Sequence, residues 1–295
     1  MDIGICLDRF YETTLKHSPQ TLNKLKKIGF GTLDYPIYGP WNFPNPIFEN
    51  PKDFWQNYFL EERKIIEEQG LKVYQTHATF RSDFDQDNFG SFSQKVIDQL
   101  KKEIEATAIL GAKYVVIHPM KDMGIKNKDV YFQRNVEGFE KLTPFLKEFN
   151  VTCALENLFE FDSLRGTYDD TWCECPDDLI KYIDALDQTC FCACLDTGHS
   201  NLVGSSPAFA TRKLGKRLKV LHVNDNFSKK DLHLPVGIGH IDWNDFAIAL
   251  KEIGYDGAFN LELSLNRYKN INDDAFWKMV EFSYISAKAV VDKIK

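Results

Sequence analysis

Histidines and carboxylates recur in this sequence directly after short apolar runs. In the stretch YQTHATF, for example, His77 closes the apolar part, and in CLDTGH an acid is followed three positions later by His199. Such a mixed set moves protons and holds divalent zinc, manganese, cobalt or iron, whereas magnesium and calcium prefer oxygen ligands alone. The pattern comprises nine residues, namely His77, His118, Glu156, Asp196, His199, His222, Asp231, His233 and Glu262.

The acids of this set need partners if the apolar runs are buried strands. A carboxylate left unpaired at the end of such a strand loses its hydration, so it must share a proton or hold a cation. A single histidine after an apolar run is more often an ordinary core residue than a ligand, but nine equivalent positions favour one common site. Two histidines fall outside the pattern: we expect His17 on the surface, and His240 lies in the loop after the seventh run.

Eight short apolar runs alternate with longer segments of helical periodicity along the whole chain, without a linker or a low-complexity stretch. The runs span residues 2–8, 31–38, 71–79, 112–120, 151–158, 190–198, 218–225 and 257–265. Several are apolar at successive positions, which is typical of parallel strands that are covered on both faces. Between the runs lie amphipathic segments such as 91–111, where Ile97, Leu100 and Ile104 share one face.

Eight strand–helix units predict a (β/α)8 TIM barrel, a single domain over residues 1–295, with its site at the carboxyl ends of the strands. A doubly wound open sheet is the alternative. It is disfavoured because no glycine-rich phosphate turn follows the first run.

The composition excludes several classes of function. The net charge of −7 provides no positive field toward a phosphate backbone, so we expect no nucleic acid as partner. The basic runs 24–27 and 216–219 precede strands and therefore belong to the opposite end of the barrel. No segment resembles a signal peptide or the roughly 20 apolar residues of a membrane span, so we expect a cytoplasmic protein with no membrane contact. The seven cysteines lie largely in apolar runs and are interpreted as structural thiols.

The order of these motifs resembles the xylose isomerase-like barrels. That superfamily contains sugar and sugar-phosphate isomerases and epimerases, and also apurinic-site nucleases of the endonuclease IV type. The resemblance runs through nearly the whole chain, and its most specific part is DLHLPVGIGHIDW at 231–243. In the isomerase and epimerase branch it implies one divalent metal, zinc, manganese or cobalt, which is held by Glu156, Asp196, His222 and Glu262.

The nuclease branch uses all nine side chains for three zinc ions, so the motifs alone leave one to three metals open. In either case Asp231 and His233 extend the site, as ligands of a further ion or as partners that orient His222. The same two roles, ligand of a further ion or orienting partner, are possible for His77, His118 and His199. The second half of the loop predicts a structural role, with Gly237 and Gly239 allowing a tight turn and Asp242 capping the helix at 243–254.

The resemblance implies isomerisation or epimerisation of a small carbohydrate through an enediolate, with Glu156 and Glu262 as the pair that moves the proton. His118 and His199 are then candidates for hydrogen bonds to substrate hydroxyls. Trp41 and Phe43 provide an apolar wall for the sugar or simply pack the rim.

One difference from the family pattern concerns substrate binding. Some ketose epimerases carry an arginine soon after the seventh-strand histidine, whereas this loop offers Lys229 and Lys230, which either meet a substrate anion or are solvated.

Two other functions are weighed against this one. A multinuclear-zinc phosphodiesterase explains all nine side chains, but the acidic composition argues against it. A catalytically silent sugar- or metal-binding barrel does not need two glutamates around its metal. The sequence leaves assembly into a homo-oligomer open.

Overall fold

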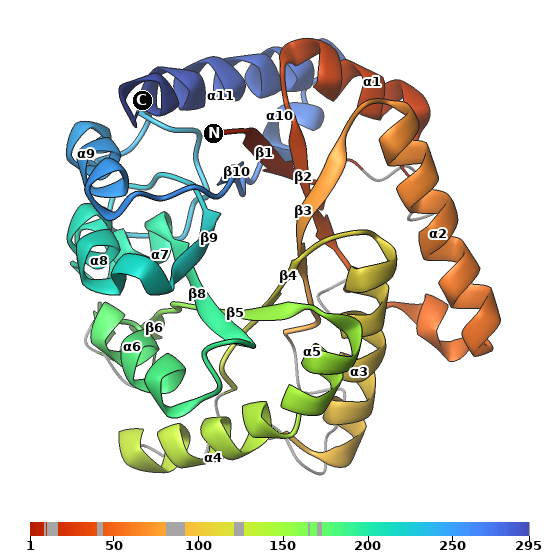
Figure 1. Ribbon diagram of the computed structural model, residues 1–295. Helices are drawn as coiled ribbons and strands as arrows, with labels where there is room; N and C mark the ends of the chain where they lie inside the picture. The colour runs from red at the N-terminus through yellow and green to blue at the C-terminus, as the bar shows by residue number, and fades with distance from the viewer. Residues whose placement is uncertain are drawn as a thin grey trace.

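Eight parallel strands form the centre of the molecule, and Figure 1 looks along them with the helices outside. The computed structural model describes residues 1–8, 10, 17–39, 44–80, 92–120, 127–164, 166–169 and 173–294. The strands are β1 (Ile3–Cys6), β2 (Thr32–Pro36), β3 (Lys72–His77), β4 (Tyr114–Ile117), β5 (Thr152–Glu156), β8 (Phe191–Asp196), β9 (Leu218–His222) and β10 (Phe259–Leu261). Each of the eight lies within one of the predicted apolar runs.

The sheet closes on itself between β9 and β10. Along the sheet the order is β10-β1-β2-β3-β4-β5-β8-β9. Just beyond β9, Val223 forms a parallel bridge with Leu261, and its N–H donates to the carbonyl of Asn260 over 2.8 Å. The predicted barrel is therefore confirmed, and the open sheet is excluded.

Helices cover the outside of the barrel. They are α1 (Pro19–Ile28), α2 (Lys52–Glu68), α3 (Gln94–Ile109), α4 (Lys128–Glu140), α5 (Thr143–Phe149), α6 (Pro176–Ala185), α7 (Thr197–Leu202), α8 (Pro207–Leu214), α9 (Trp243–Ile253), α10 (Asn266–Lys269) and α11 (Asp273–Ile294), with single 3₁₀ turns at Pro46–Glu49 (η2) and Gly215–Arg217 (η4). The predicted apolar face of α3 is buried at Ile97, Leu100 and Ile104. Asp242 caps α9 as expected, since its carboxylate accepts from the N–H groups of Asn244 and Asp245.

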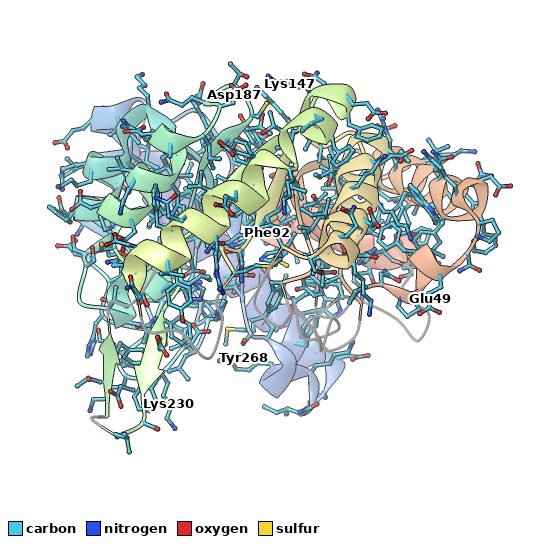
Figure 2. All side chains as sticks on the ribbon, turned by 90° about the horizontal axis from the view of Figure 1, so that it is seen from below. Glu49, Phe92, Lys147, Asp187, Lys230 and Tyr268 are labelled. Carbon is cyan, nitrogen blue, oxygen red and sulfur yellow. The ribbon has the colours of Figure 1, made fainter. Side chains whose placement is uncertain are left out.

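A small hairpin that the sequence did not predict stands beside the barrel. Its antiparallel strands are β6 (Glu160–Asp162) and β7 (Thr167–Asp169). Figure 2 shows it projecting at the end where Lys230 is labelled, whereas Lys147 and Asp187 mark the other end of the barrel. The hydroxyl of Tyr168 donates to the carbonyl of Lys229 over 3.0 Å, which ties the hairpin to the loop after β9.

The prediction that His17 lies on the surface is wrong. Only 2% of the residue is exposed, and its Nδ1 lies 3.0 Å from a carboxylate oxygen of Glu62 on α2. The hydroxyl of Tyr35 on β2 donates to the same oxygen over 3.1 Å. A buried acid 45 positions away is the reason that this histidine is internal, and nothing near His17 in the sequence indicates it.

The cysteines agree with their predicted structural role. No disulfide joins any of the seven, all of which lie within the described residues, and six are buried while Cys175 is half-buried. The thiol of Cys175 contacts the carboxylate of Asp178 at 3.0 Å, at the start of α6. Among the helices in the described ranges, none is long and apolar enough to cross a membrane.

Candidate metal centre

The nine side chains of the sequence pattern meet at one end of the barrel. His77, Glu156, Asp196 and His222 are each the last residue of a strand, namely β3, β5, β8 and β9. The remaining five follow strands: His118 follows β4, His199 lies in α7, Asp231 and His233 lie in the loop after β9, and Glu262 follows β10. The carboxyl ends of the barrel strands thus bring together residues that are up to 185 positions apart in the sequence, from His77 to Glu262.

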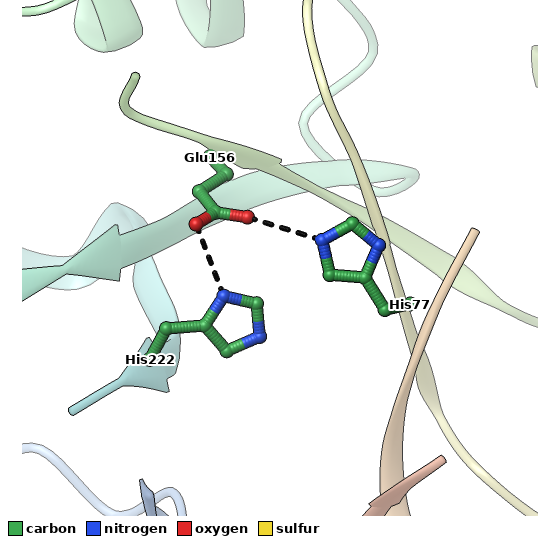
Figure 3. A group of neighbouring side chains, drawn as sticks. All are labelled: His77, Glu156 and His222. Carbon is green, nitrogen blue, oxygen red and sulfur yellow. Dashed lines mark ion pairs between the residues drawn. The ribbon is translucent and has the colours of Figure 1, made fainter. Parts of the chain in front are cut away.

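Glu156 lies at the centre of the cluster. One carboxylate oxygen is 3.1 Å from Nδ1 of His222, and the other is 3.4 Å from Nε2 of His77 (Figure 3). The second oxygen also lies 3.0 Å from Nε2 of His118. Burial alone would raise the pKa of Glu156, but His222 and His118 outweigh it and hold that pKa well below its ordinary value. This glutamate is therefore an anion although only 1% of it is exposed.

Three overlapping groups within the cluster have spacings that suit metal ions. In each, one ligand atom per residue lies within 4.8 Å of the others; the groups are His77, Glu156 and His222; Asp196, His199 and His233; and Glu156, Asp196, His222 and Glu262. The two remaining side chains join them directly, because His118 lies 3.0 Å from Glu156 and Asp231 lies 3.0 Å from His233. The cluster is continuous rather than a set of separate ion pairs.

Asp34, on β2, orients His222 and was missed by the sequence analysis. Its carboxylate oxygen lies 3.0 Å from Nε2 of His222 and also accepts from the side-chain amides of Gln75 and Asn260, at 3.0 and 3.3 Å. Because this oxygen already accepts from two amides, Nε2 of His222 donates to it, and Nδ1 is the ring nitrogen that faces the cluster. A carboxyl in the middle of a buried strand was the signal that could have identified Asp34.

The unpaired ring nitrogen of His222 is the observation that tests whether a metal fits. Its buried Nδ1 has no hydrogen-bond partner among the described residues, and it faces carboxylate oxygens of Glu156 and Glu262 at 3.1 and 3.6 Å. An imidazole nitrogen among carboxylates matches the donor set of a divalent transition ion. The residues therefore fit the metal.

Asp196 is held by its neighbours on both sides. One carboxylate oxygen accepts from the N–H of His199 over 2.7 Å, and the other accepts from the side-chain amide of Asn224 over 2.7 Å. Asn157, next to Glu156, bonds both the N–H and the carbonyl of Asp196. Burial raises the pKa of Asp196 to about 6. A positive group near this carboxylate would favour its ionised form.

His199 and His233 point the same ring nitrogen toward Asp231. Their Nδ1 atoms lie 2.9 Å from the carbonyl of Asn157 and 3.0 Å from the carbonyl of Glu262, so each Nδ1–H donates to backbone. Their Nε2 atoms lie 3.9 and 3.0 Å from one oxygen of Asp231. Burial would lower the pKa of His199, but Asp196 and Asp231 raise it to about 10.

The loop that carries Asp231 and His233 is folded around a buried carboxylate, Asp225. This side chain accepts from the N–H groups of Gly237 and Gly239, both over 3.0 Å, and from the indole N–H of Trp243 over 2.9 Å. A Cβ on Gly239 would stand 2.2 Å from an oxygen of Asp225, so this glycine permits a close approach. The role of both glycines was predicted from the sequence, but the acid that they surround was not.

The remaining predicted residues are placed as follows. Trp41 and Phe43 lie outside the described residues. Lys229 is exposed, and its backbone carbonyl accepts a hydrogen bond from the hydroxyl of Tyr168. His240 is exposed, with its ring against Phe227 and its N–H bonded to the carbonyl of Asn226, so it takes no part in the cluster.

Comparisons with known proteins agree with this architecture. The sequence matches the family model described as xylose isomerase-like TIM barrel over residues 22–277. Over 200 residues it is 31% identical to the probable endonuclease 4 of Bacillus cytotoxicus, covering 61% of this chain and 62% of that protein.

Solved structures are similar as well. The D-psicose 3-epimerase with D-tagatose from Clostridium cellulolyticum H10 has a TM-score of 0.77 at 16% identity, with 99% of both chains covered. The IOLI protein with a binding zinc atom has a TM-score of 0.69 at 18% identity, covering 100% of this chain and 98% of that one. At such identities these two likenesses show a shared fold. The family model, in contrast, spans most of the sequence from α1 into α11, and the chain belongs to the xylose isomerase-like TIM barrel family.

Proposed function

We propose that this protein is a divalent-metal-dependent isomerase or epimerase of a sugar or sugar phosphate. The observation that carries the proposal is the group formed by Glu156, Asp196, His222 and Glu262, whose ligand atoms lie within 4.8 Å of one another. Glu156, at the end of β5, and Glu262, just after β10, both reach one candidate metal position. Zinc, manganese or cobalt suits this mixture of imidazole and carboxylate.

The chemistry requires a proton to leave a carbon next to a carbonyl and to return. When bound, a divalent metal acidifies that C–H bond and stabilises the resulting enediolate by drawing charge from the carbonyl and its neighbouring hydroxyl. Glu156 and Glu262 are the proposed proton carriers, one removing the proton and the other returning it. The pKa of each is held below its ordinary value against the effect of burial, in both cases with His222 as the largest opposing influence, so both are available as bases.

The other chain groups hold these carboxylates in place. His77 and His118 contact the same oxygen of Glu156, which restricts the rotation of its carboxylate. Asp196 and His222 anchor the metal, with Asn224 and Asp34 fixing their orientation. We further propose that His118 and His199 bind substrate hydroxyls, and that Trp41 and Lys229 contact the sugar and any anionic group on it.

A second candidate function is a multinuclear-zinc phosphodiesterase of the endonuclease IV type. The convergence of all nine side chains favours it, as does the 31% identity to a probable endonuclease 4. In that case His77 and His118 would hold one ion with Glu156, and His199, Asp231 and His233 would hold another. Such ions, when bound, would supply the activation of water and the neutralisation of charge that phosphodiester hydrolysis requires.

A parallel assay distinguishes the two functions. The metal-loaded protein is incubated in heavy water with a panel of ketoses and ketose phosphates, and separately with a duplex that contains an abasic site. We expect deuterium at the carbon next to the carbonyl of at least one sugar, because the proton passes through a carboxylate that exchanges with solvent.

Cleavage of the abasic-site duplex without deuterium in any sugar would contradict the isomerase proposal and support the phosphodiesterase. If neither reaction occurs with protein of confirmed metal content, both proposals fail and a sugar- or metal-binding barrel remains. Glu262→Gln is the control, since it should remove labelling while the protein stays folded.

A further inference from the structure

A pocket opens at the opposite end of the barrel from the metal centre. Its volume is about 400 Å³, and it lies at the amino ends of β4, β5, β8 and β9, which are neighbours in the sheet. In Figure 2 this is the end marked by Lys147 and Asp187. The same four strands lead to His118, Glu156, Asp196 and His222 at their other ends.

Cationic side chains gather around this pocket. Lys113 precedes β4, Lys219 lies in β9, and Lys216 and Arg217 belong to the turn before β9. The guanidinium of Arg217 is already neutralised by Asp184, with two contacts of 2.7 and 2.8 Å. The three lysines, in contrast, have no ion pair within 4.0 Å among the described residues. The basic run 216–219, which the proposed function leaves unused, is therefore part of the wall of a cavity.

Lys113 and Lys219 lie near the same residue of the pocket wall, Cys192. Burial raises the pKa of the Cys192 thiol to about 12, while the positive charges of Lys219 and Lys113 act in the opposite direction. Both charges are therefore close to Cys192, which lines the pocket. The carbonyl of Lys219 accepts from the hydroxyls of Tyr74 and Tyr255 at 3.1 and 3.3 Å, which holds this residue at the edge of the barrel.

The remaining wall suits a small ligand with several oxygens. Thr152, Gln188 and Thr189 contribute polar groups, and Ile183 and Phe191 contribute apolar surface. A volume of this size falls in the range of small-molecule sites, roughly 300–1,000 Å³. Asp256 is near enough to affect Tyr74 and Tyr114, but it does not line the pocket.

We propose that this pocket binds a small phosphate-bearing polyanion through Lys113, Lys216 and Lys219. Lysine ammonium groups bind phosphate as point charges, and three lysines that line one pocket without an ion pair among the described residues give its wall a positive charge. Either inorganic polyphosphate or a phosphorylated metabolite has this chemistry. The site requires no metal, and it is separate from the catalytic proposal above.

Calorimetric titration with inorganic pyrophosphate and with ribose 5-phosphate tests the proposal. We expect one ligand per chain and, for the double variant Lys113→Gln, Lys219→Gln, an affinity that is lower by about tenfold or more because two charge contacts are lost. Tighter binding of pyrophosphate identifies the inorganic source, and tighter binding of ribose 5-phosphate identifies a phosphorylated metabolite.

Two controls make the result specific. Lys278→Gln removes an exposed lysine on α11 and should leave the affinity unchanged. Glu156→Gln alters the metal centre and should also leave it unchanged. If neither probe binds to the unaltered chain, if the double variant binds as tightly as that chain, or if Glu156→Gln removes binding, the proposal is overturned, in the last case because the anion sits at the metal centre.

Discussion

Nε2 of His222 and a carboxylate oxygen of Asp34 lie 3.0 Å apart, and both side chains are completely buried. The two residues are 188 positions apart, on β9 and β2, strands that are not neighbours in the sheet. This contact makes Nε2 the nitrogen of His222 that donates to Asp34 and Nδ1 the one that faces Glu156. Partners of this kind raise the basicity of a ligating imidazole and hold its ring in place.

The first prediction concerns this contact. Asp34→Asn removes the negative charge but keeps an oxygen that can accept from His222, so the barrel should stay folded. Metal affinity should fall by about 10- to 100-fold, the usual effect of losing such a partner. Competition with a fluorescent chelator measures this, with the exposed Asp53→Asn as control. An unchanged affinity would mean that Asp34 acts only in packing.

The second prediction separates the roles of the two glutamates. Glu156→Gln should remove both metal binding and activity, because its carboxylate contacts His77, His118 and His222 at the centre of the cluster. Glu262→Gln should retain more of the metal but lower kcat by about 100-fold or more, as expected for loss of a proton carrier. Metal content and steady-state kinetics of each variant provide the readout. Full activity of either variant would rule out its proposed role.

A third prediction uses the two glycines of the loop after β9. Gly239→Ala places a Cβ 2.2 Å from a carboxylate oxygen of Asp225 and 2.3 Å from the carbonyl of Asn226, so the loop must shift. We expect a loss of about 1–3 kcal/mol in the free energy of unfolding, typical of overpacking, together with weaker metal binding.

Gly237→Ala is the matched control for that loop. This glycine has a φ of +84° and nothing within 4 Å of its added Cβ, so the substitution costs about 1–2 kcal/mol of backbone strain without displacing Asp225. Metal affinity should therefore fall in the first variant and not in the second. Equal effects on metal affinity would show that Asp225 does not position the loop.

A fourth prediction concerns the dependence of stability on acid. A hydrogen bond from Lys147, together with those from Thr189, holds the pKa of Asp187 well below its ordinary value. The stabilisation is fully present above the unfolded pKa of about 3.9 and is lost as the pH falls through the lower, folded value. Asp187→Asn should remove this stabilisation above about pH 4 and flatten the fall of stability at lower pH. Superimposable curves for both proteins would contradict the pairing.

The sequence was sufficient for the barrel and for most of the candidate site. Short apolar runs are buried on both faces only in a covered parallel sheet, and a barrel puts whatever follows each strand at a common end. Residues such as His77 and Glu262 could therefore be grouped without knowing any distance between them.

The residues that hold the ligands were not predicted, because they depend on contacts between distant elements. Asp34 and Asp225 are buried acids that find their donors only after folding, and His17 is internal because Glu62 on α2 is buried beside it. The β6–β7 hairpin has strands of three residues each, too short for a clear alternation of apolar and polar positions.

The metal content of the purified protein decides whether the proposed metal centre exists. The protein is purified without added metal, its divalent transition ions are counted per chain by elemental analysis, and activity toward the labelled ketose is followed as a chelator removes them. We expect at least one zinc, manganese or cobalt ion per chain and activity that is lost with it and restored when it is returned. Full activity in protein that contains no such ion would rule out a metal-dependent isomerase.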